Sequence, residues 1–275
     1  MTGKCIHLEG RAVLALTGED RLNFLEGLIT RGIKHIGQDA WVYAGLLTPQ
    51  GKYLHDFFLR EESETLLLDC AESQAATLTR KLMMYRLRSK VDIAQTDRQV
   101  FAHLGVEDGP HVDPRLAAMG ARSLDGDPTG TMADYNAHRL RLGVPDGPDD
   151  FLQDKTLWLE TNADVLGGVD FDKGCYVGQE ITARMRYRGK VRRRLIPIKA
   201  TQPIPAHTPI HLGERQVGDT RSTIETTDGA LGLANLRVED LEKGPLRAGD
   251  VELSPWVPDW LAPAITPDES AAHGT

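Results

Sequence analysis

Three short apolar segments separated by two polar turns constrain the fold of this chain most strongly. The segments cover about Trp41 to Leu47, Lys52 to Leu59 and Thr65 to Asp69. The turns between them, residues 48–51 and 61–64, contain the proline, glycine and polar residues that favour chain reversal. Because such short connections join neighbouring strands, the pattern predicts an antiparallel meander.

Helical periodicity flanks this meander on both sides. A cap-like sequence introduces a predicted helix near residues 18 to 30, where apolar residues recur at helical spacing. The same spacing predicts a second helix over Ser73 to Leu87, with Met83 and Met84 filling the core. A short apolar segment, Val100 to Leu104, predicts a further strand.

The second half of the chain is less regular. Between Gly105 and Gly147 the density of glycine, proline and aspartate leaves the secondary structure open. Beyond Gly189, short apolar segments broken by turns predict a small β-barrel or sandwich, so we expect a domain boundary near residue 190. The polar stretch Ala262 to Thr275 is expected to be a frayed tail.

Composition narrows the class of protein. A length of 275 residues suits two or three domains, and the net charge of -8 disfavours a protein that coats nucleic acid. Cys5, Cys70 and Cys175 lie far apart, which indicates neither a disulfide framework nor a self-contained zinc site. The first 30 residues lack the order of a signal peptide, and no apolar run approaches the roughly 20 residues of a membrane span. We therefore expect a cytoplasmic protein without a membrane anchor.

The most distinctive local motif frames one thiol between two glycines, in the octapeptide Lys173 to Glu180. Gly174 and Gly178 permit a shaped turn and close approach of another molecule. A neighbouring lysine and the arginines that follow could favour the reactive thiolate form of Cys175. Free cysteine is also common as a small buried residue, so the motif alone leaves both readings open.

Cationic side chains occupy every second position after this motif: Arg184, Arg186, Arg188, Lys190, Arg192 and Arg194. In an extended strand these residues would form one basic face, either as a solvated edge or as a site for an anion. Because the chain is acidic overall, a small polyanionic ligand fits this face better than nucleic acid does. If the segment is instead a short helix, Arg184 could pair with Glu180.

The octapeptide matches the K-G-C-[FYW]-x-G-Q-E signature of the YgfZ family, the folate-binding iron–sulfur maintenance proteins related to the glycine cleavage T-protein. Residues 159–162, 181–184, 189–197 and 87–91 also resemble family patterns, and the resemblance covers about residues 8 to 258. The segment Gly178 to Pro197 is especially similar to the branch that includes the mitochondrial iron–sulfur assembly factor.

This resemblance implies an α+β fold. Two interleaved folate-binding lobes and a small C-terminal β-barrel would form a ring-like arrangement around a central cavity. The lobes are expected at about 1–95 and 96–190, within a folate-binding region 1–190. The barrel would cover 191–258, and 259–275 would be a flexible tail.

The resemblance also implies a cofactor, tetrahydrofolate or a one-carbon derivative of it, and partners that are iron–sulfur scaffold or client proteins. A carboxylate suits the 2-amino and N3 edge of the pterin, and arginines suit the glutamate tail. The expected cofactor-binding residues are Glu160, Asn162, Lys173, Gln179, Glu180, Arg184, Arg186 and Arg188. Cys175 is the expected functional thiol. Any cluster that it contacts must be shared, since one thiolate cannot fill about four ligand positions.

The chain departs from the T-protein at one catalytic position. An aspartate follows the third strand of the meander in that enzyme, whereas the corresponding segment, Ser73 to Leu78, holds Gln74 and no aspartate. Aminomethyltransferase activity is therefore in doubt, and whether the protein is an enzyme stays open. The favoured function is a folate-dependent factor for assembly or repair of iron–sulfur clusters. The alternatives are a one-carbon transferase and an accessory protein of RNA modification, including tRNA modification.

Overall fold

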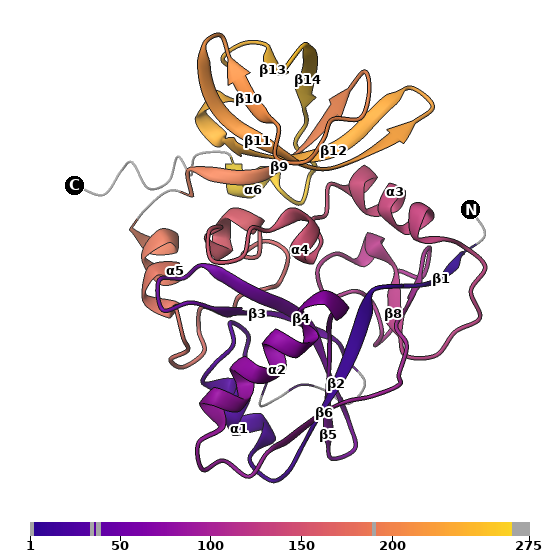
Figure 1. Cartoon of the computed structure of the whole chain (residues 1–275), viewed down its shortest axis with the longest axis vertical. Helices are drawn as coiled ribbons and strands as arrows, with labels where there is room; N and C mark the ends of the chain where they lie inside the picture. The colour runs from indigo at the N-terminus through magenta and orange to yellow at the C-terminus, as the bar shows by residue number, and fades with distance from the viewer. Residues whose placement is uncertain (1–2, 34–35, 37–39, 189–190, 266–275) are drawn as a thin grey trace. The chain divides into compact units, whose positions relative to one another are not determined.

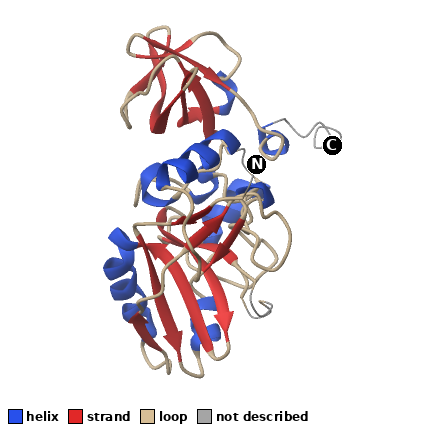
Figure 2. Ribbon diagram, turned by 90° about the vertical axis from the view of Figure 1, so that its right-hand side faces the viewer, coloured by secondary structure: helices blue, strands red, loops and turns tan. Residues whose placement is uncertain are grey.

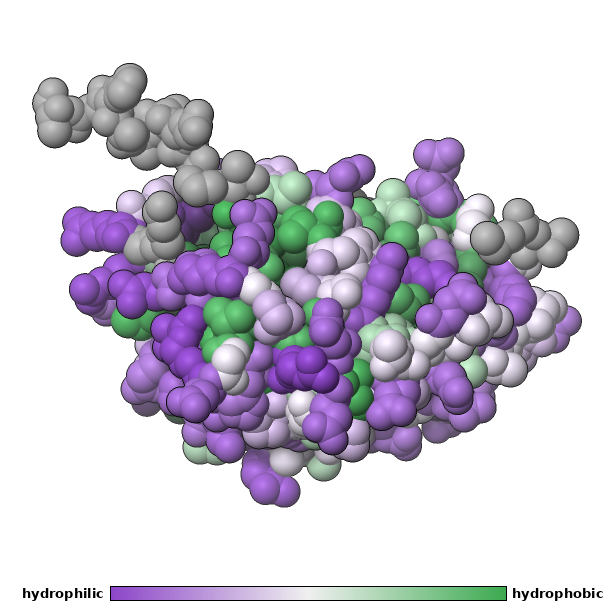
Figure 3. Space-filling view, turned by 90° about the horizontal axis from the view of Figure 1, so that it is seen from above, coloured by the Kyte–Doolittle hydropathy of each residue, from purple (hydrophilic) through white to green (hydrophobic). Residues whose placement is uncertain are grey.

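The computed structural model describes residues 3–33, 36, 40–188 and 191–265. The chain divides into two compact units, Met1–Val191 and Arg192–Thr275 (Figure 1). Among the described helices, none combines the length and the apolar character that a membrane span requires. Figure 3 views one face of the molecule, on which hydrophilic side chains surround scattered apolar ones. The expected ring-like arrangement concerns the placement of the parts and stays a prediction.

The first unit is built on a five-stranded antiparallel sheet with the order β3-β4-β5-β2-β6 (Figures 1 and 2). Its strands are β2 (Arg11–Thr17), β3 (Val42–Leu47), β4 (Tyr53–Glu62), β5 (Thr65–Ala71) and β6 (Asp92–Gln95). Strand β4 pairs with β3 on one side and with β5 on the other, which confirms the predicted meander. Strand β2, which comes earlier in the chain, pairs with β5 and with β6 and so extends the sheet beyond the meander.

Two helices pack on one face of this sheet, α1 (Arg21–Glu26) and α2 (Glu72–Arg86). They share one apolar core with alternate residues of the strands, as the two-residue period of a half-buried strand requires. Helix α1 is shorter than predicted because it ends at Gly27, after which Ile29 bridges to Leu46 of β3. The prediction that Met83 and Met84 fill the core is wrong, since their side chains are 41% and 67% exposed.

The same unit contains a smaller antiparallel sheet of order β1-β7-β8. Its strands are β1 (Cys5–His7), β7 (Phe101–His103) and β8 (Ala121–Ser123), and β7 confirms the strand expected near residue 100. The helical segments of this part are η1 (Ala117–Met119), α3 (Met132–Leu142), α4 (Gly147–Asp150), η2 (Trp158–Thr161) and α5 (Gln179–Tyr187). Within the region that the sequence left open, α3 begins with a Thr131–Asp134 capping box and ends at Gly143 in the left-handed conformation.

The second unit is a closed barrel of order β10-β11-β12-β9-β14-β13. Its elements are β9 (Arg193–Ala200), β10 (Pro209–Leu212), β11 (Arg215–Thr226), β12 (Gly229–Arg237), η3 (Val238–Asp240), β13 (Leu246–Ala248), β14 (Val251–Pro255) and α6 (Ala262–Ile265). The first four residues of the expected tail are therefore helical and follow the buried Leu261, which corrects that expectation. Residues 266–275 lie outside the described residues.

Candidate functional site

Cys175 lies on an exposed turn whose two flanks are buried. We call residues 171–178 the thiol loop. The side chain of Lys173 is 2% exposed and Tyr176 is buried, whereas Gly174 and Cys175 between them are exposed. A β-carbon added at Gly174 would meet no atom within 4 Å. The thiol is therefore presented to the surface by residues that are themselves fixed in the interior.

Lys173 fixes the N-terminal flank of the thiol loop. Its ammonium group donates to three backbone carbonyls that follow or end α1, at 2.7, 2.8 and 2.9 Å, those of Glu26, Ile29 and Arg31. These bonds match the three protons of an ammonium group and neutralise the carbonyl-rich end of a helix. The contacts support an anchoring role for Lys173, because the cation is directed at backbone oxygens.

Two glycines fix the C-terminal flank. Gly178 has φ +85°, and a β-carbon there would lie 2.6 Å from the carbonyl oxygen of Thr48 in the β3–β4 turn. Gly51 in the same turn has φ +71°, and its β-carbon would lie 3.1 Å from Ile181 of α5. Only residues without a β-carbon allow this close approach. The thiol loop and the start of α5 are thus seated on the meander.

Tyr176 completes this seat from the interior. Burial raises the pKa of Tyr176 to about 12, and a hydrogen bond with Thr182 opposes that rise. The Thr182 hydroxyl also donates to the carbonyl of Gly178 at 3.0 Å. The contacts tie the first turn of α5 to the residue that follows the cysteine.

The cationic stripe is not one extended face. Arg184 and Arg186 lie in α5, where positions two apart are separated by about 200° around the helix. Arg184 and Arg188 lie four positions apart and share a side; Arg186 instead stands over the Phe171 ring at 5.5 Å. The extended interpretation is wrong for Arg184 and Arg186, which are helical. Lys190 lies outside the described residues, and Arg194 is buried in β9 of the barrel.

The two remaining residues of the octapeptide open α5. Gln179 is half-buried at its first position, and Glu180 is exposed in the first turn. A carboxylate in this turn interacts favourably with the positive end of the helix dipole. The position of Glu180 therefore has a local structural reason, independent of any ligand.

Glu160 and Asn162 lie on η2, and α5 packs against this short helix. Glu160 is half-buried, and its Oε2 atom accepts a hydrogen bond from the backbone N–H of Leu157 at 3.3 Å. Asn162 is fully buried with φ +67° and ends the helix. The structure thus brings η2 and the start of α5 together, although about twenty residues separate them in sequence.

Cys175 is the exposed thiol of the chain. Cys5 is partly buried, and burial of Cys70 raises the pKa of its thiol to about 12. Within the described ranges, no group of three or more histidine, cysteine, aspartate or glutamate side chains is arranged to hold a metal ion. A metal or cluster bound at Cys175 would therefore need ligands from another molecule.

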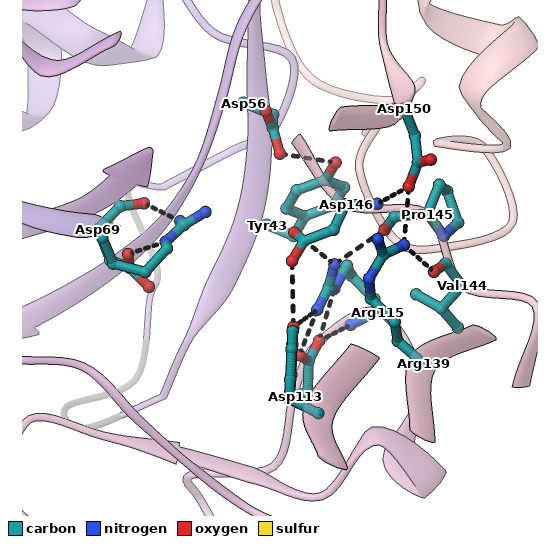
Figure 4. Close-up of polar contacts among 12 residues, drawn as sticks. Tyr43, Asp56, Asp69, Asp113, Arg115, Arg139, Val144, Pro145, Asp146 and Asp150 are labelled. Carbon is teal, nitrogen blue, oxygen red and sulfur yellow. Dashed lines mark hydrogen bonds and ion pairs between the residues drawn. The ribbon is translucent and has the colours of Figure 1, made fainter. Parts of the chain in front are cut away.

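A second concentration of charge is buried in the same unit, and sequence reasoning missed it (Figure 4). Arg115 donates to both carboxylate oxygens of Asp113 at 3.0 and 2.9 Å, to the Tyr135 hydroxyl at 3.1 Å and to the Pro145 carbonyl at 3.1 Å. Burial alone would raise the pKa of Asp146, but Arg115 and other guanidinium groups outweigh it and lower the pKa to about 2. We call these residues the Arg115 cluster.

Further buried ion pairs extend this cluster. Arg139 pairs with Asp150 at 2.7 Å, and Asp69 accepts from Arg11 at 2.6 Å and from Arg122. These partners lie 11 to 58 residues apart in the sequence, so no local motif could predict the pairs. Bidentate and multiple pairing of this kind is what a buried charge requires.

His55 and Asp56 are adjacent in β4 and make different contacts. Asp56 accepts from the hydroxyls of Tyr53 at 2.9 Å and Tyr43 at 3.3 Å, and burial raises its pKa to about 6. His55 lies 3.1 Å from the Gln74 amide oxygen, and burial lowers the pKa of its imidazole. The Gln74 amide oxygen thus serves as a neutral acceptor, and it also accepts from the Tyr53 hydroxyl at 3.3 Å.

Comparison with known proteins decides the family. The iron–sulfur cluster assembly factor IBA57, mitochondrial, of Homo sapiens is 34% identical over 93% of this chain and 85% of its own length. The chain belongs to the IBA57 family of iron–sulfur cluster assembly factors. The Mus musculus relative of the same name is 32% identical with the same coverage, and residues 192–263 match the CAF17 C-terminal β-barrel domain.

The fold is also that of a solved relative. The glycine cleavage system aminomethyltransferase T of Bartonella henselae superposes with a TM-score of 0.73 over 92% of this chain and 84% of its own, at 15% identity. The similarity confirms the expected α+β fold with its C-terminal barrel. The expected cytoplasmic location is corrected by the relatives, because the IBA57 proteins compared here are designated mitochondrial.

Proposed function

We propose that this protein supports the assembly of iron–sulfur clusters by lending Cys175 as one ligand of a cluster that a partner protein shares. The observation that carries the proposal is the exposed thiol held between the buried Lys173 and Tyr176. Relatives named as iron–sulfur cluster assembly factors support the same function.

The chemistry of the site favours sharing over storage. An iron–sulfur cluster takes about four protein ligands, usually thiolates. Cys175 supplies one, and the described residues offer no group of ligands around it. A single ligand on a fixed, open turn can join a cluster presented by another protein and leave it again, as transfer requires.

We further propose that the protein binds a reduced folate, with Glu160 on the pterin edge. Its half-buried carboxylate lies on η2 beside α5, and the fold resembles that of an aminomethyltransferase. Arg184 in α5 and Arg188, which caps the helix and donates its backbone N–H to the Arg184 carbonyl, are the arginines best placed to act together on a glutamate tail. Asn162 and Lys173 would act indirectly, since both serve as buried supports.

Aminomethyl transfer has weaker support. Gln74 carries a neutral amide in place of the T-protein carboxylate, and its oxygen already faces Tyr53 and His55. The buried carboxyl group of Asp56 lies in the same part of the unit, and both of its oxygens accept hydrogen bonds from tyrosine hydroxyls. The RNA alternative loses its basic strand, because α5 distributes the arginines around a helix.

The test of cluster sharing compares variants of Cys175 and Cys5 in cells that lack their own IBA57 protein. We expect Cys175→Ser to abolish the recovery of activity and iron content in client iron–sulfur enzymes. Cys5→Ser is the matched control and should restore both, because Cys5 is partly buried and distant in sequence. Equal rescue by Cys175→Ser and wild type would eliminate the proposal.

The test of folate binding titrates tetrahydrofolate against the purified protein under anaerobic conditions. Glu160→Gln should weaken binding about tenfold or more, since it removes a charge-assisted bidentate acceptor. Glu64→Gln, at an exposed carboxylate in the β4–β5 turn, should bind as wild type does. Absence of saturable binding by wild type would remove the folate claim and leave the role of Cys175 intact.

A further inference from the structure

The C-terminal end of α2 and the loop after it form a basic and apolar surface in a chain that is acidic overall. Residues 80–90 contain five lysines and arginines and no carboxylate, against a net charge of -8 for the chain. Met83, Met84 and Leu87 are 41%, 67% and 87% exposed within this segment. We call Arg80, Met83, Met84, Leu87 and Arg88 the basic apolar patch.

The exposure of Leu87 is built into the fold. Leu87 ends α2 with φ +46°, a conformation that favours glycine over leucine. A hydrogen bond fixes the loop that follows to the turn before α1: the backbone N–H of Lys90 donates to the Asp20 carboxylate at 2.8 Å. A β-carbon at Gly18 would lie 2.2 Å from the Lys90 carbonyl, so the two backbones are in direct contact. A strained leucine held outward by a fixed loop points to a binding role.

A shallow pocket of about 800 Å³, open to solvent, lies beside this leucine. Its lining residues are Asp20, Asn23, Phe24, Leu87, Arg88 and Ser89. Phe24 belongs to the apolar core and provides an apolar wall, and Leu87 provides another. The volume falls within the range of small-molecule and side-chain pockets. The surface can therefore receive an inserted apolar group.

The cations around the pocket favour an acidic partner. Three of the five cations have local partners: Lys81 the Tyr85 ring at 5.7 Å, Arg86 the Asp92 carboxylate at 3.6 Å, and Lys90 the Glu19 carboxylate at 2.5 Å. Arg80 and Arg88 are exposed, and neither forms an ion pair within the part of the chain that the structure describes. These two guanidinium groups are available to carboxylates of another molecule.

We propose that the basic apolar patch docks an acidic segment of another protein, which inserts an apolar side chain into the cavity and places carboxylates on Arg80 and Arg88. Exposed methionines suit such a surface because they adapt to the partner's shape. An anionic membrane would also attract cations, but a bilayer offers no side chain to fill a concave pocket. The proposal goes beyond cluster sharing and does not depend on Cys175.

The probe is a fluorescein-labelled peptide in which leucines alternate with glutamates, followed by fluorescence anisotropy. We expect saturable binding by wild type that weakens as salt is added. The double variant Arg80→Glu, Arg88→Glu should bind about tenfold or more weakly. The matched control Arg184→Glu, Arg188→Glu makes the same charge change on α5 and should bind as wild type does. Equal binding by both double variants, or no saturable binding by wild type, overturns the proposal.

Leu87→Gly separates docking from folding. Glycine tolerates the positive φ at this position, so the variant should unfold no earlier than wild type, while its affinity for the peptide falls about tenfold. Unchanged affinity would show that Leu87 takes no part. Vesicles containing phosphatidylserine provide the other arm: wild type should not sediment with them. Sedimentation that Leu87→Gly abolishes would assign the patch to a membrane and overturn the protein-docking proposal.

Discussion

The Arg115 cluster and the thiol loop lie in the same unit and use charge in opposite ways. In the cluster, Arg115 meets carboxylates, a hydroxyl and a carbonyl that are all buried with it. In the thiol loop, the one buried cation, Lys173, meets backbone carbonyls, and the functional group beside it is left in solvent. In this protein the dense set of titratable groups therefore supports the interior, whereas a turn with few titratable groups presents the proposed functional thiol.

The largest expected effect is loss of the Arg115 charge. Arg115→Met leaves the buried Asp113 and the partly buried Asp146 without their main counter-charge, and should lower the free energy of unfolding by about 3 kcal/mol. Chemical denaturation measures this, with the exposed Arg184→Met as control at about 0.5 kcal/mol or less. A loss below about 1 kcal/mol would mean that the cluster is not the support described above.

Lys173→Met tests whether the thiol loop depends on one buried anchor. The change removes three hydrogen bonds from an ammonium group to the end of α1, and should cost about 2–3 kcal/mol of unfolding free energy. Amide hydrogen exchange should also accelerate across residues 171–178. The exposed Lys90→Met is the control. Unchanged exchange in the thiol loop would contradict the anchoring role.

The raised pKa of Asp56 makes the stability of the protein depend on pH. Burial raises its pKa from 3.8 to about 6, so the folded protein holds a proton that the unfolded chain releases earlier. Its contribution to stability is therefore full below about pH 4 and is lost as the pH rises through 6, by about 2–3 kcal/mol in all. Asp56→Asn should flatten the stability curve between pH 4 and 6, because the amide does not titrate; its oxygen can accept from one tyrosine hydroxyl and its NH2 group can donate to the other.

Asp146 makes the stability of the protein depend on pH in the opposite direction, at lower pH. Its pKa is lowered to about 2, so the stability it provides is lost as the pH falls from about 4 to 2. Asp56→Asn should leave this acid limb unchanged, since Asp146 still titrates there. A wild-type curve that is flat between pH 4 and 6, measured by thermal unfolding, would show that Asp56 does not hold its proton.

The sequence predicted the elements that depend on neighbouring residues, and it did not predict the contacts between residues far apart in the chain. Short apolar segments and turn chemistry predicted the meander, because strand pairing there is set by neighbouring segments. The Arg115 cluster joins residues such as Arg11 and Asp69 across 58 positions, and only the folded chain brings them together. The arginine stripe failed for a related reason: a two-residue period of charge says nothing about the backbone, and α5 is helical.

The same distinction explains the thiol loop. Its glycines were visible in the octapeptide, but the partner glycine of Gly178 is Gly51, in a turn more than a hundred residues earlier. Met83 and Met84 fitted a helical period yet face solvent, since a period identifies a helix and does not by itself say which side packs on the sheet.

The smallest expected effect on stability is at the site itself. Cys175 is exposed and is fixed by its neighbours, so Cys175→Ser should change the free energy of unfolding by less than about 0.5 kcal/mol. In the native protein an aromatic disulfide reagent should react rapidly with one thiol, and this rapid phase should vanish in Cys175→Ser. Cys70 should react only after unfolding, because it is buried and its pKa is raised to about 12. A rapid phase that persists in Cys175→Ser would place the accessible thiol elsewhere, and the contrast between a sealed cluster and an open thiol loop would fail.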